Sequence, residues 1–468
     1  MRLIEYRRKS SAGRGITRIQ RYGSIALESR KAKTLASDVT SQVTGDVQRM
    51  VSGVMGEIST LMLVCPRDFI NDIAYREILS AILLEFSNRA AVILCAEWDV
   101  ADIAAVLDKI IGQVGFPAER ITRVTLYSGE VTPFAQDICV CLERSQSSGT
   151  GTFFFLEPTE FFRLDDRNIC DAVADTITQT VLLSHLRFHG GNMLCSDTDI
   201  LIGSDHFQEN QPTTEGLSAA QITVSTLQTF RNSLDETRDA MQLRCEDTSV
   251  PEPVNLPEDG ELTFHYLDEQ AVGRSQPLFH IDMFVTPLGK LNGRQMVVVA
   301  EPEASPQWGG QIDLLSSLPF QEIVDEFVRQ DYLVARIPIT TKTLGMRPWR
   351  QRVRWLSDRN PNHRRIRDAA MKAGAGMNEF IGIREHHILS WNNVMVENIG
   401  WDSLKILMPT YGHTFDNRCR GVYEKLGARV QDIPDMTVLA TLRGAVHCVV
   451  RDVARRGGTE FPAPTGIA

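Results

Sequence analysis

The chain has 468 residues, of which 43% are hydrophobic and 23% charged, and this composition excludes disorder throughout. Its unbroken apolar stretches fall far short of the ~18 residues that a membrane-spanning helix needs, so we expect a soluble protein without a membrane partner. The 49 basic and 59 acidic residues give a formal charge of −10. This charge disfavours a general nucleic-acid binder and favours a cationic partner.

Cysteine use and the N-terminal segment bear on the cellular compartment. The nine cysteines form neither a small disulfide framework nor a zinc-finger spacing, so a reducing cytoplasm fits best. Residues 1–55 are predicted to be a basic arm, flexible or helical, and the first 35 of them carry ten Lys or Arg side chains. The arm has no apolar core of signal-peptide type, so it is either a solvated chain end or an organellar address.

From residue 59 onward, short β-branched runs alternate with helical patterns, and this alternation predicts an α/β fold. Strands are predicted at 60–65, 91–95, 138–142, 200–203, 279–285, 296–300, 332–337, 394–397, 404–408 and 445–450. Helices are predicted at 73–86, 100–114, 320–329 and 417–426. The succession repeats loosely along the chain.

Two stretches interrupt the alternation and are predicted to be insertions. The first, 208–273, combines an amphipathic helix at 219–243 with a loop rich in proline and acidic residues. The second, 341–376, is basic and carries eight arginines interleaved with Trp349 and Trp355. Its charge is either a solvated face, as charge runs commonly are, or a surface for RNA or an acidic partner.

Side chains able to do chemistry lie near the C-terminus and in the middle of the chain. In the apolar run at 445–450, Cys448 follows His447. Neighbours in a strand point to opposite faces, so another histidine is needed as the base. His280 and Asp282 stand two apart in a predicted strand and therefore share a face. An imidazole that moves protons and a carboxylate that holds a cation can line one pocket.

Five short motifs carry more information by their order than any one of them does alone. They are Gln136-Asp137, Gly190-Gly191-Asn192, His280-Ile281-Asp282, Ser390-Trp391-Asn392-Asn393 and His447-Cys448. Singly, an acid at a strand start or a glycine pair is commonly just a turn. In this order they resemble the guanidino-group-modifying superfamily. Its members include peptidyl-arginine, agmatine and arginine deiminases, dimethylarginine hydrolases and arginine:glycine amidinotransferases.

The resemblance spans about residues 59–456 and implies a pentein fold, a five-bladed pseudo-symmetric α/β propeller of ββαβ units around a central channel. We therefore expect one catalytic domain over 56–460, carrying the two insertions, and a tail at 461–468. Strand ends from several blades would bring residues more than three hundred positions apart into one channel. One departure stands out: arginine deiminases and dimethylarginine hydrolases carry an acid after the glycine pair, where this chain has Asn192.

The resemblance implies a catalytic set of Cys448, His280, Asp282 and Asp137, and this set suits the chemistry of a guanidinium. A guanidinium is planar, cationic and resonance-stabilised. Attack at its carbon needs carboxylates for the N–H groups, a soft nucleophile and a proton donor for the departing amine. Asp137 and Asp282 would clamp the substrate, and Cys448 would form a covalent amidino-thioether. His280 would protonate the leaving nitrogen and then activate a water. Neither a metal nor a cofactor is expected.

Asn192 and Arg443 are further candidates for substrate binding. Arg443, or an arginine of the second insertion, could bind the carboxylate of free arginine, whereas a protein substrate would need an open mouth. Two carboxylates near Cys448 should raise the pKa of its thiol, and a bound guanidinium would reverse that effect, so we expect substrate-assisted activation. The alternative is a standing thiolate paired with protonated His280.

Three functions stay open. The first is hydrolysis of arginine, an arginine derivative or a protein-bound arginine to a citrulline-type ureido product and ammonia. The runner-up is transfer of the amidino group to an acceptor amine, through the same covalent intermediate. The third is a non-catalytic guanidine-binding protein on the same scaffold. The expected partner is a cationic guanidine, with a homo-oligomer left open, and the expected location is the cytoplasm unless the arm is an organellar address.

Overall fold

A computed structural model of the chain describes residues 48–457 except 128–130, 145–151, 162, 213–215, 246–247, 292, 344, 346 and 401–402. The predicted tail at 461–468 and residues 1–47 of the predicted arm lie outside the described residues. Residues 48–55 were also predicted to be arm, but β1 (Gln48–Met50) pairs antiparallel with β5 (Val140–Arg144). Met50 and Val54 are buried, so the boundary predicted at residue 55 is too late.

One supersecondary unit recurs in all five sheets that the described residues form: two antiparallel strands, a helix, and a third strand parallel to the second. The first sheet has the order β21-β2-β3-β4 and joins the two ends of the described chain. Its elements are β2 (Glu57–Val64), α4 (Arg67–Ile70), α5 (Ile73–Phe86), β3 (Ala91–Ala96), α6 (Ala101–Val114), η1 (Ala118–Arg120), β4 (Ile121–Thr125) and β21 (Val450–Arg456).

Two further sheets follow in chain order. The second has the order β1-β5-β6-β7, with β6 (Thr152–Glu157) and β7 (Thr180–Leu183). Its strands are connected through η2 (Ala135–Asp137), η3 (Leu164–Asn168) and α7 (Ile169–Ile177). The third has the order β10-β9-β8 and contains η4 (Gly190–Asn192), β8 (Met193–Cys195), β9 (Asp199–Gly203), α8 (Ser204–Glu209), α9 (Ala219–Leu234) and β10 (Asp239–Leu243).

The largest sheet has seven strands, and the last has three. The large sheet contains β11 (Val254–Asn255), β12 (Thr263–Leu267), η5 (Glu269–Ala271), η6 (Ile281–Met283), β13 (Val285–Leu291), β14 (Arg294–Pro302), η7 (Pro306–Trp308), α10 (Phe320–Arg329), β15 (Leu333–Thr343), β16 (Trp349–Arg352), η8 (Val353–Trp355), α11 (Pro361–Lys372) and β17 (Phe380–Ser390). The last sheet contains β18 (Met395–Asn398), β19 (Leu404–Pro409), α12 (Phe415–Lys425) and β20 (Arg429–Ile433), and it is followed by α13 (Thr437–Ala440) and α14 (Val446–Val449).

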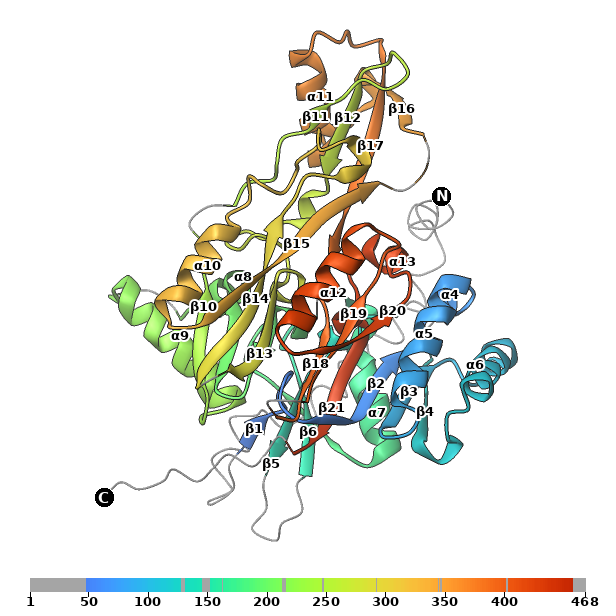
Figure 1. The fold of residues 1–468 in the computed structure, drawn as a ribbon, viewed down its shortest axis with the longest axis vertical. Coiled ribbons are helices and arrows are strands. Elements are labelled where there is room, and N and C mark those ends of the chain that lie inside the picture. The colour runs from blue at the N-terminus through green and yellow to red at the C-terminus, as the bar shows by residue number, and fades with distance from the viewer. Residues whose placement is uncertain are drawn as a thin grey trace.

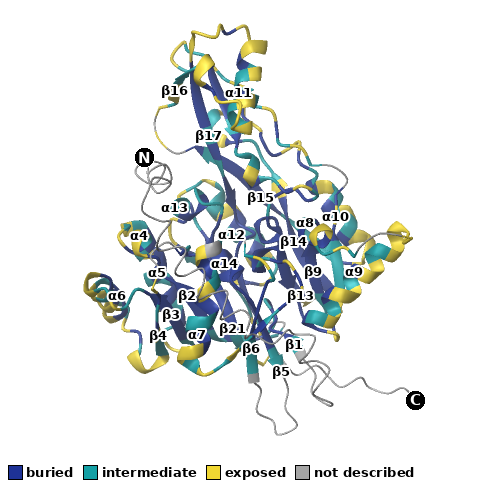
Figure 2. Ribbon diagram, turned by 180° about the vertical axis from the view of Figure 1, so that it is seen from behind, coloured by how far each residue is buried: buried dark blue, intermediate teal, exposed yellow. Residues whose placement is uncertain are grey.

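Local sequence explains why these elements form. The α5 segment buries residues at helical spacing, from Tyr75 through Ile78 and Ile82 to Phe86, and Asp72 caps its first turn by accepting from the Ala74 amide. β3 is apolar along its length because it lies between two parallel strands and is almost wholly buried. Figure 2 shows buried strands at the centre, with exposed residues on helices such as α6 and α9. The predicted α/β class is therefore confirmed.

The segment 208–273 is not one insertion, and its predicted helix at 219–243 is too long. The helix ends at Leu234 because the Asp235 carboxylate accepts from the amides of Met50 and Thr237, which turns the chain away. The following residues form β10, which pairs in parallel with β9 and completes an α/β unit. Only the later part of the segment leaves the repeating pattern.

That later part and the arginine-rich segment build one structure, which we call the outgrowth: β11, β12, β16, α11 and the start of β17. β12 and β16 both pair with β17. The outgrowth has a separate apolar core made of Phe264, Val353, Leu356, Ile366, Ala370, Ala375, Ile381 and Ile383. Figure 1 shows it at the top of the view, at the far end of the seven-stranded sheet. No described helix combines the length and the apolar character needed to cross a membrane.

Candidate active site

The nucleophile candidate Cys448 lies in α14, a single helical turn, and not in the strand predicted at 445–450. Asn393 accounts for the difference, because its side-chain oxygen accepts from the Cys448 amide at 3.2 Å and its carbonyl accepts from the His447 amide at 3.4 Å. These tertiary bonds hold an apolar, β-branched run in a helical turn. Asn393 Nδ2 also donates to Cys448 Sγ at 3.1 Å, and the thiol points to Asp282 Oδ2 at 3.6 Å.

His280 and Asp282 come together by a route other than the predicted strand at 279–285. His280 precedes the 3-10 turn η6, and the next strand begins only at Val285. The turn closes because the Phe284 amide donates to the Ile281 carbonyl and the Met283 amide donates to the His280 carbonyl. Both side chains are nevertheless buried and lie beside Gly191. The exposed fraction is 5% for His280 and 2% for Asp282.

Asp137 ends the 3-10 turn η2 and reaches the same cluster from the second sheet. Its Oδ1 accepts from the Gly191 amide at 3.1 Å and lies 3.7 Å from His280 Nδ1. Its Oδ2 accepts from Arg163 at 2.8 Å, and Arg163 also binds Asp166. The carboxylate is thus held from one side and presents its other oxygen to His280.

Gly191 marks the point on which these side chains converge. A Cβ at this residue would lie 2.8 Å from His280 Nδ1, 2.9 Å from Asp282 Oδ2 and 3.2 Å from Asp137 Oδ1. Gly191 is therefore needed for close packing, because a side chain at this position would collide with these groups. Two carboxylates and an imidazole gathered against one glycine are groups that can bind a small planar cation.

The charges around this point act on Cys448 and Asp137 in opposite directions. Burial raises the pKa of the Cys448 thiol well above its ordinary value, and the Asp282 and Asp137 carboxylates raise it further. Burial also opposes ionisation of Asp137, but His280, Arg163 and His189 outweigh it and lower the pKa of that carboxyl. The empty site therefore holds a protonated thiol and an ionised Asp137.

Solved structures with a similar fold include deiminases. The Campylobacter jejuni agmatine deiminase is 12% identical, with a TM-score of 0.54 over 88% of this chain and 97% of that one. The Enterococcus faecalis agmatine deiminase is 11% identical, with a TM-score of 0.53 over 88% and 99%. A protein assigned as a peptidyl-arginine deiminase gives 12% and 0.52 over 86% and 98%. The chain has the deiminase fold.

Comparison of whole sequences does not reveal this fold. Neither the profiles of known protein families nor the sequences of curated proteins match this chain. The resemblance inferred from five ordered motifs is thus supported by the fold of deiminases from the guanidino-group-modifying superfamily. Within the described residues, no group of three or more His, Cys, Asp or Glu side chains is suited to a metal ion.

Two residues predicted to bind substrate have other partners in this deiminase fold. Asn192 Oδ1 accepts from the Ile281 amide at 3.1 Å and from Gln276 at 2.8 Å, so its amide oxygen holds the turn that carries Asp282. Arg443 forms an ion pair with Asp268, which ties the loop before α14 to the segment after β12. In the empty protein, neither side chain is bonded to the cluster around Gly191.

Several residues outside the predicted set contact it in the structure. His447 Nδ1 is 2.9 Å from Asp282 Oδ2, although strand alternation had placed it on the opposite face from Cys448. One helical turn lets both neighbours reach the same carboxylate. Asn393 was quoted only as part of a motif, and the Asn-Asn pair before a strand was its one signal. Arg163 stands outside every motif, so no sequence signal pointed to it.

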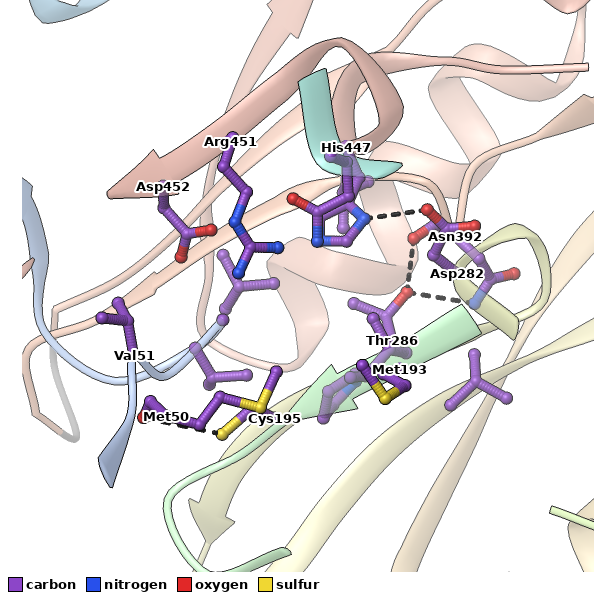
Figure 3. Close-up of a pocket in the computed structure, with 18 residues that line it drawn as sticks. Met50, Val51, Met193, Cys195, Asp282, Thr286, Asn392, His447, Arg451 and Asp452 are labelled. Carbon is purple, nitrogen blue, oxygen red and sulfur yellow. Dashed lines mark hydrogen bonds and ion pairs between the residues drawn. The ribbon is translucent and has the colours of Figure 1, made fainter. Parts of the chain in front are cut away.

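A cavity lies beside Asp282 and His447. Figure 3 shows His447, Arg451 and Asp452 along one side of it and Asn392 with Thr286 along another. Asn392 is held by Thr286, whose hydroxyl donates to the Asn392 carbonyl at 2.7 Å. Asp282 thus lines this cavity and also contacts the Cys448 thiol.

Proposed function

We propose that the chain hydrolyses a guanidino group to a ureido product and ammonia through a covalent bond to Cys448. One observation carries the proposal: Asp137, Asp282 and His280 gather against the Gly191 backbone, and Cys448 Sγ lies 3.6 Å from Asp282 Oδ2. A guanidinium that binds to this cluster would meet both carboxylates. The deiminase fold supports the same chemistry without identifying the substrate.

Substrate binding would also activate the nucleophile. In the empty site the Cys448 pKa is raised by burial and by two carboxylates, so little thiolate exists near neutral pH. A bound guanidinium brings a positive charge between those carboxylates and favours the thiolate. The Asn393 amide group that donates to Sγ would keep the sulfur in place during this change.

His280 can carry the protons that the covalent reaction of Cys448 moves. As Cys448 Sγ bonds to the guanidinium carbon, the thiol proton goes to His280 Nδ1. His280 then gives that proton to one amino group, whose C–N bond breaks and releases ammonia. Water attacks the remaining cationic amidino-thioether and gives one proton to His280. As the C–S bond breaks, the hydroxyl proton leaves to solvent, where it converts the released ammonia to ammonium, and the ureido product forms. His280 finally returns the proton to Sγ.

The residues discussed above would bind the guanidinium, and none is assigned to the rest of the substrate. Arginine, agmatine and an arginine-containing peptide are therefore tested separately, each with and without glycine as an acceptor amine. Hydrolysis predicts a ureido product and ammonia in equal amounts, independent of glycine. Amidino transfer predicts a product only when glycine is present. No product from any substrate, with native circular dichroism, would leave a binding protein and overturn the proposal.

The variant Cys448→Ser is the matched control for these assays. A hydroxyl is close in size to a thiol but is a far weaker nucleophile at neutral pH. It should abolish turnover while leaving the fold unchanged. Activity within tenfold of the wild type would remove Cys448 from the mechanism.

We also propose that the five sheets are the blades of the propeller that the resemblance implies. Each sheet holds one ββαβ unit, and β21 pairs with β2, which brings the last strand into the first sheet. Such closure is how circular arrangements of sheets protect their edges.

A further inference from the structure

His280 is hydrogen-bonded to a second histidine that lies outside the predicted catalytic set. His189 Nδ1 lies 3.1 Å from His280 Nε2, and the two rings meet edge to face with centroids 5.3 Å apart. His280 Nδ1, the other ring nitrogen, lies 3.7 Å from Asp137 Oδ1 and faces the Gly191 backbone. The two nitrogens of His280 thus face two different partners.

We propose that His189 is a positioning residue that accepts the Nε2–H of His280 and so keeps Nδ1 as the atom that exchanges protons with the substrate. This inference rests on the proposed function, because it assigns a proton carrier within that reaction. The tautomer of a histidine is set by the hydrogen bond that its other nitrogen makes. A fixed Nε2–H leaves Nδ1 to take and give a proton at each step.

The protonation states of the surrounding groups support a hydrogen bond in which His280 Nε2–H donates to His189 Nδ1. Burial and, to a lesser extent, the neighbouring His280 lower the pKa of His189 to about 4. His189 is therefore neutral near pH 7 and can accept a proton at Nδ1. The charged or titratable groups that face the pair are Asp137, Asp282, Arg163 and His206. When His280 becomes cationic during the reaction, Asp137 stabilises it and a neutral His189 does not repel it.

Packing keeps both rings in these positions. The His189 amide donates to His206 Nδ1 at 3.3 Å, and the His189 and His206 rings are perpendicular with centroids 4.7 Å apart. The Phe279 ring lies 4.5 Å from that of His280. His189 also lines a pocket with Asp137, Phe161, Arg163 and Asp166. The pair is therefore fixed on one side and borders a pocket on the other.

A neutral imidazole differs from a carboxylate in the same role. A carboxylate partner stabilises a cationic histidine by its full charge, as in the Ser-His-Asp triad, whereas imidazole offers only a lone pair. His189→Glu should therefore move the whole pH profile of kcat to higher pH, by about one unit or more. A residue with only a packing role would change the height of that profile and not its position.

The kinetic experiment uses whichever guanidine the wild type hydrolyses. His189→Ala should lower kcat about 10- to 100-fold, as loss of an orienting partner does elsewhere, with KM within threefold. His189→Gln should recover part of this loss, because its amide oxygen can accept the same proton. His185→Gln, at an exposed histidine four residues earlier in the same segment, is the control and should match the wild type. A His189→Glu profile that superimposes on the wild-type profile would overturn the proposal.

A second experiment needs no turnover and so separates this proposal from the proposed function. Imidazole ¹⁵N spectra of Cys448→Ser would be recorded against pH, with the His280 signals identified by their loss in Cys448→Ser/His280→Gln. The proposal predicts that neutral His280 carries its proton on Nε2, and that His189→Ala mixes the two tautomers. A neutral His280 protonated on Nδ1 would contradict it. Absence of hydrolysis in every assay would sink the proposed function and leave this result standing.

Discussion

Two pairs of histidines in this protein have nearly the same geometry and different surroundings. In the first, His189 and His280 nitrogens are 3.1 Å apart, and in the second, His265 and His386 nitrogens are 3.0 Å apart. The second pair lies on β12 and β17. There Thr341 Oγ1 is 3.1 Å from the remaining nitrogen of His386, and the Glu258 carboxylate is 3.2 Å from that of His265.

The difference lies at the ends of each chain of contacts. The second pair ends on a hydroxyl and on a carboxylate that also binds Arg384 through two bonds. Each nitrogen of that pair lies within 3.2 Å of a polar neighbour, although His265 Nε2 makes no aligned hydrogen bond with any described residue. Buried polar contacts of this kind contribute to stability. The first pair ends beside Gly191, where the Asp137 and Asp282 carboxylates lie close together. Titratable groups of like charge gathered around one buried histidine are typical of functional sites.

The largest expected effect comes from exchanging one histidine of each pair. His280→Gln should lower kcat about 10²- to 10⁴-fold, the range of general acid–base catalysis, with little change in Tm. His386→Leu should leave kcat/KM near the wild-type value. It should lower the free energy of unfolding by about 1–3 kcal/mol, because Thr341 and His265 lose a buried partner. Steady-state kinetics measures the loss of activity in both variants, and urea unfolding measures the loss of stability.

The distinction between a catalytic and a structural histidine pair would be contradicted if the two variants behaved alike. Loss of activity in His386→Leu without loss of stability would show that the second pair takes part in the reaction. Full activity in His280→Gln would remove the first pair from it.

The next effect concerns two carboxylates that share Arg163. Asp137→Asn removes a charge-assisted contact to the guanidinium, which costs about 1.5–3 kcal/mol of transition-state stabilisation. The same change removes a charge that raises the Cys448 pKa, so alkylation of the empty enzyme by iodoacetamide at pH 7 should become faster. Turnover and alkylation should therefore move in opposite directions.

Asp166→Asn is the matched control for this prediction. Asp166 also binds Arg163, but its other oxygen contacts go to Thr132 and it is not among the groups that raise the Cys448 pKa. Its alkylation rate should equal that of the wild type. Unchanged or slower alkylation in Asp137→Asn, with native circular dichroism, would show that Asp137 does not act on the thiol.

The smallest effect is a change in the pH dependence of stability. Burial lowers the pKa of His386 to about 3 and that of His265 to about 4. Unfolded histidines titrate near 6.5, so from about pH 6.5 to pH 4 the unfolded chain binds protons that the folded chain does not. The free energy of unfolding should fall as pH falls through this range. In His386→Leu it should fall less steeply, and an unchanged slope in urea titrations would contradict the assigned burial.

Sequence patterns predicted the regular elements best where one element has one clear period. The helix at 73–86 and the helix at 320–329 are confirmed at both ends, because each buries one face at helical spacing. The strand at 279–285 and that at 445–450 were wrong, because tertiary bonds from Asn192 and Asn393 fold these apolar runs into turns. The site is built on such turns, so local propensity is least informative there.

The four predicted catalytic residues lie close together, although the strands on which two of the motifs were predicted to lie are turns in the structure. The motif order depends on residue identity, and Asp137, His280, Asp282 and Cys448 could be named without knowing whether they stand on strands. Partners that no motif contains could not be found this way. Arg163 reaches Asp137 only through the folding of the second sheet, and His189 contacts His280 across 91 positions of the chain.

The central claim is that Cys448 forms a covalent bond to the guanidinium carbon. The most direct measurement is the intact mass of the protein after rapid acid quenching during turnover with arginine, agmatine or an arginine peptide. The account predicts an adduct on the wild type with the mass of the substrate minus ammonia, and no adduct on Cys448→Ala. Turnover without any adduct, together with activity in Cys448→Ala within tenfold of the wild type, would contradict it.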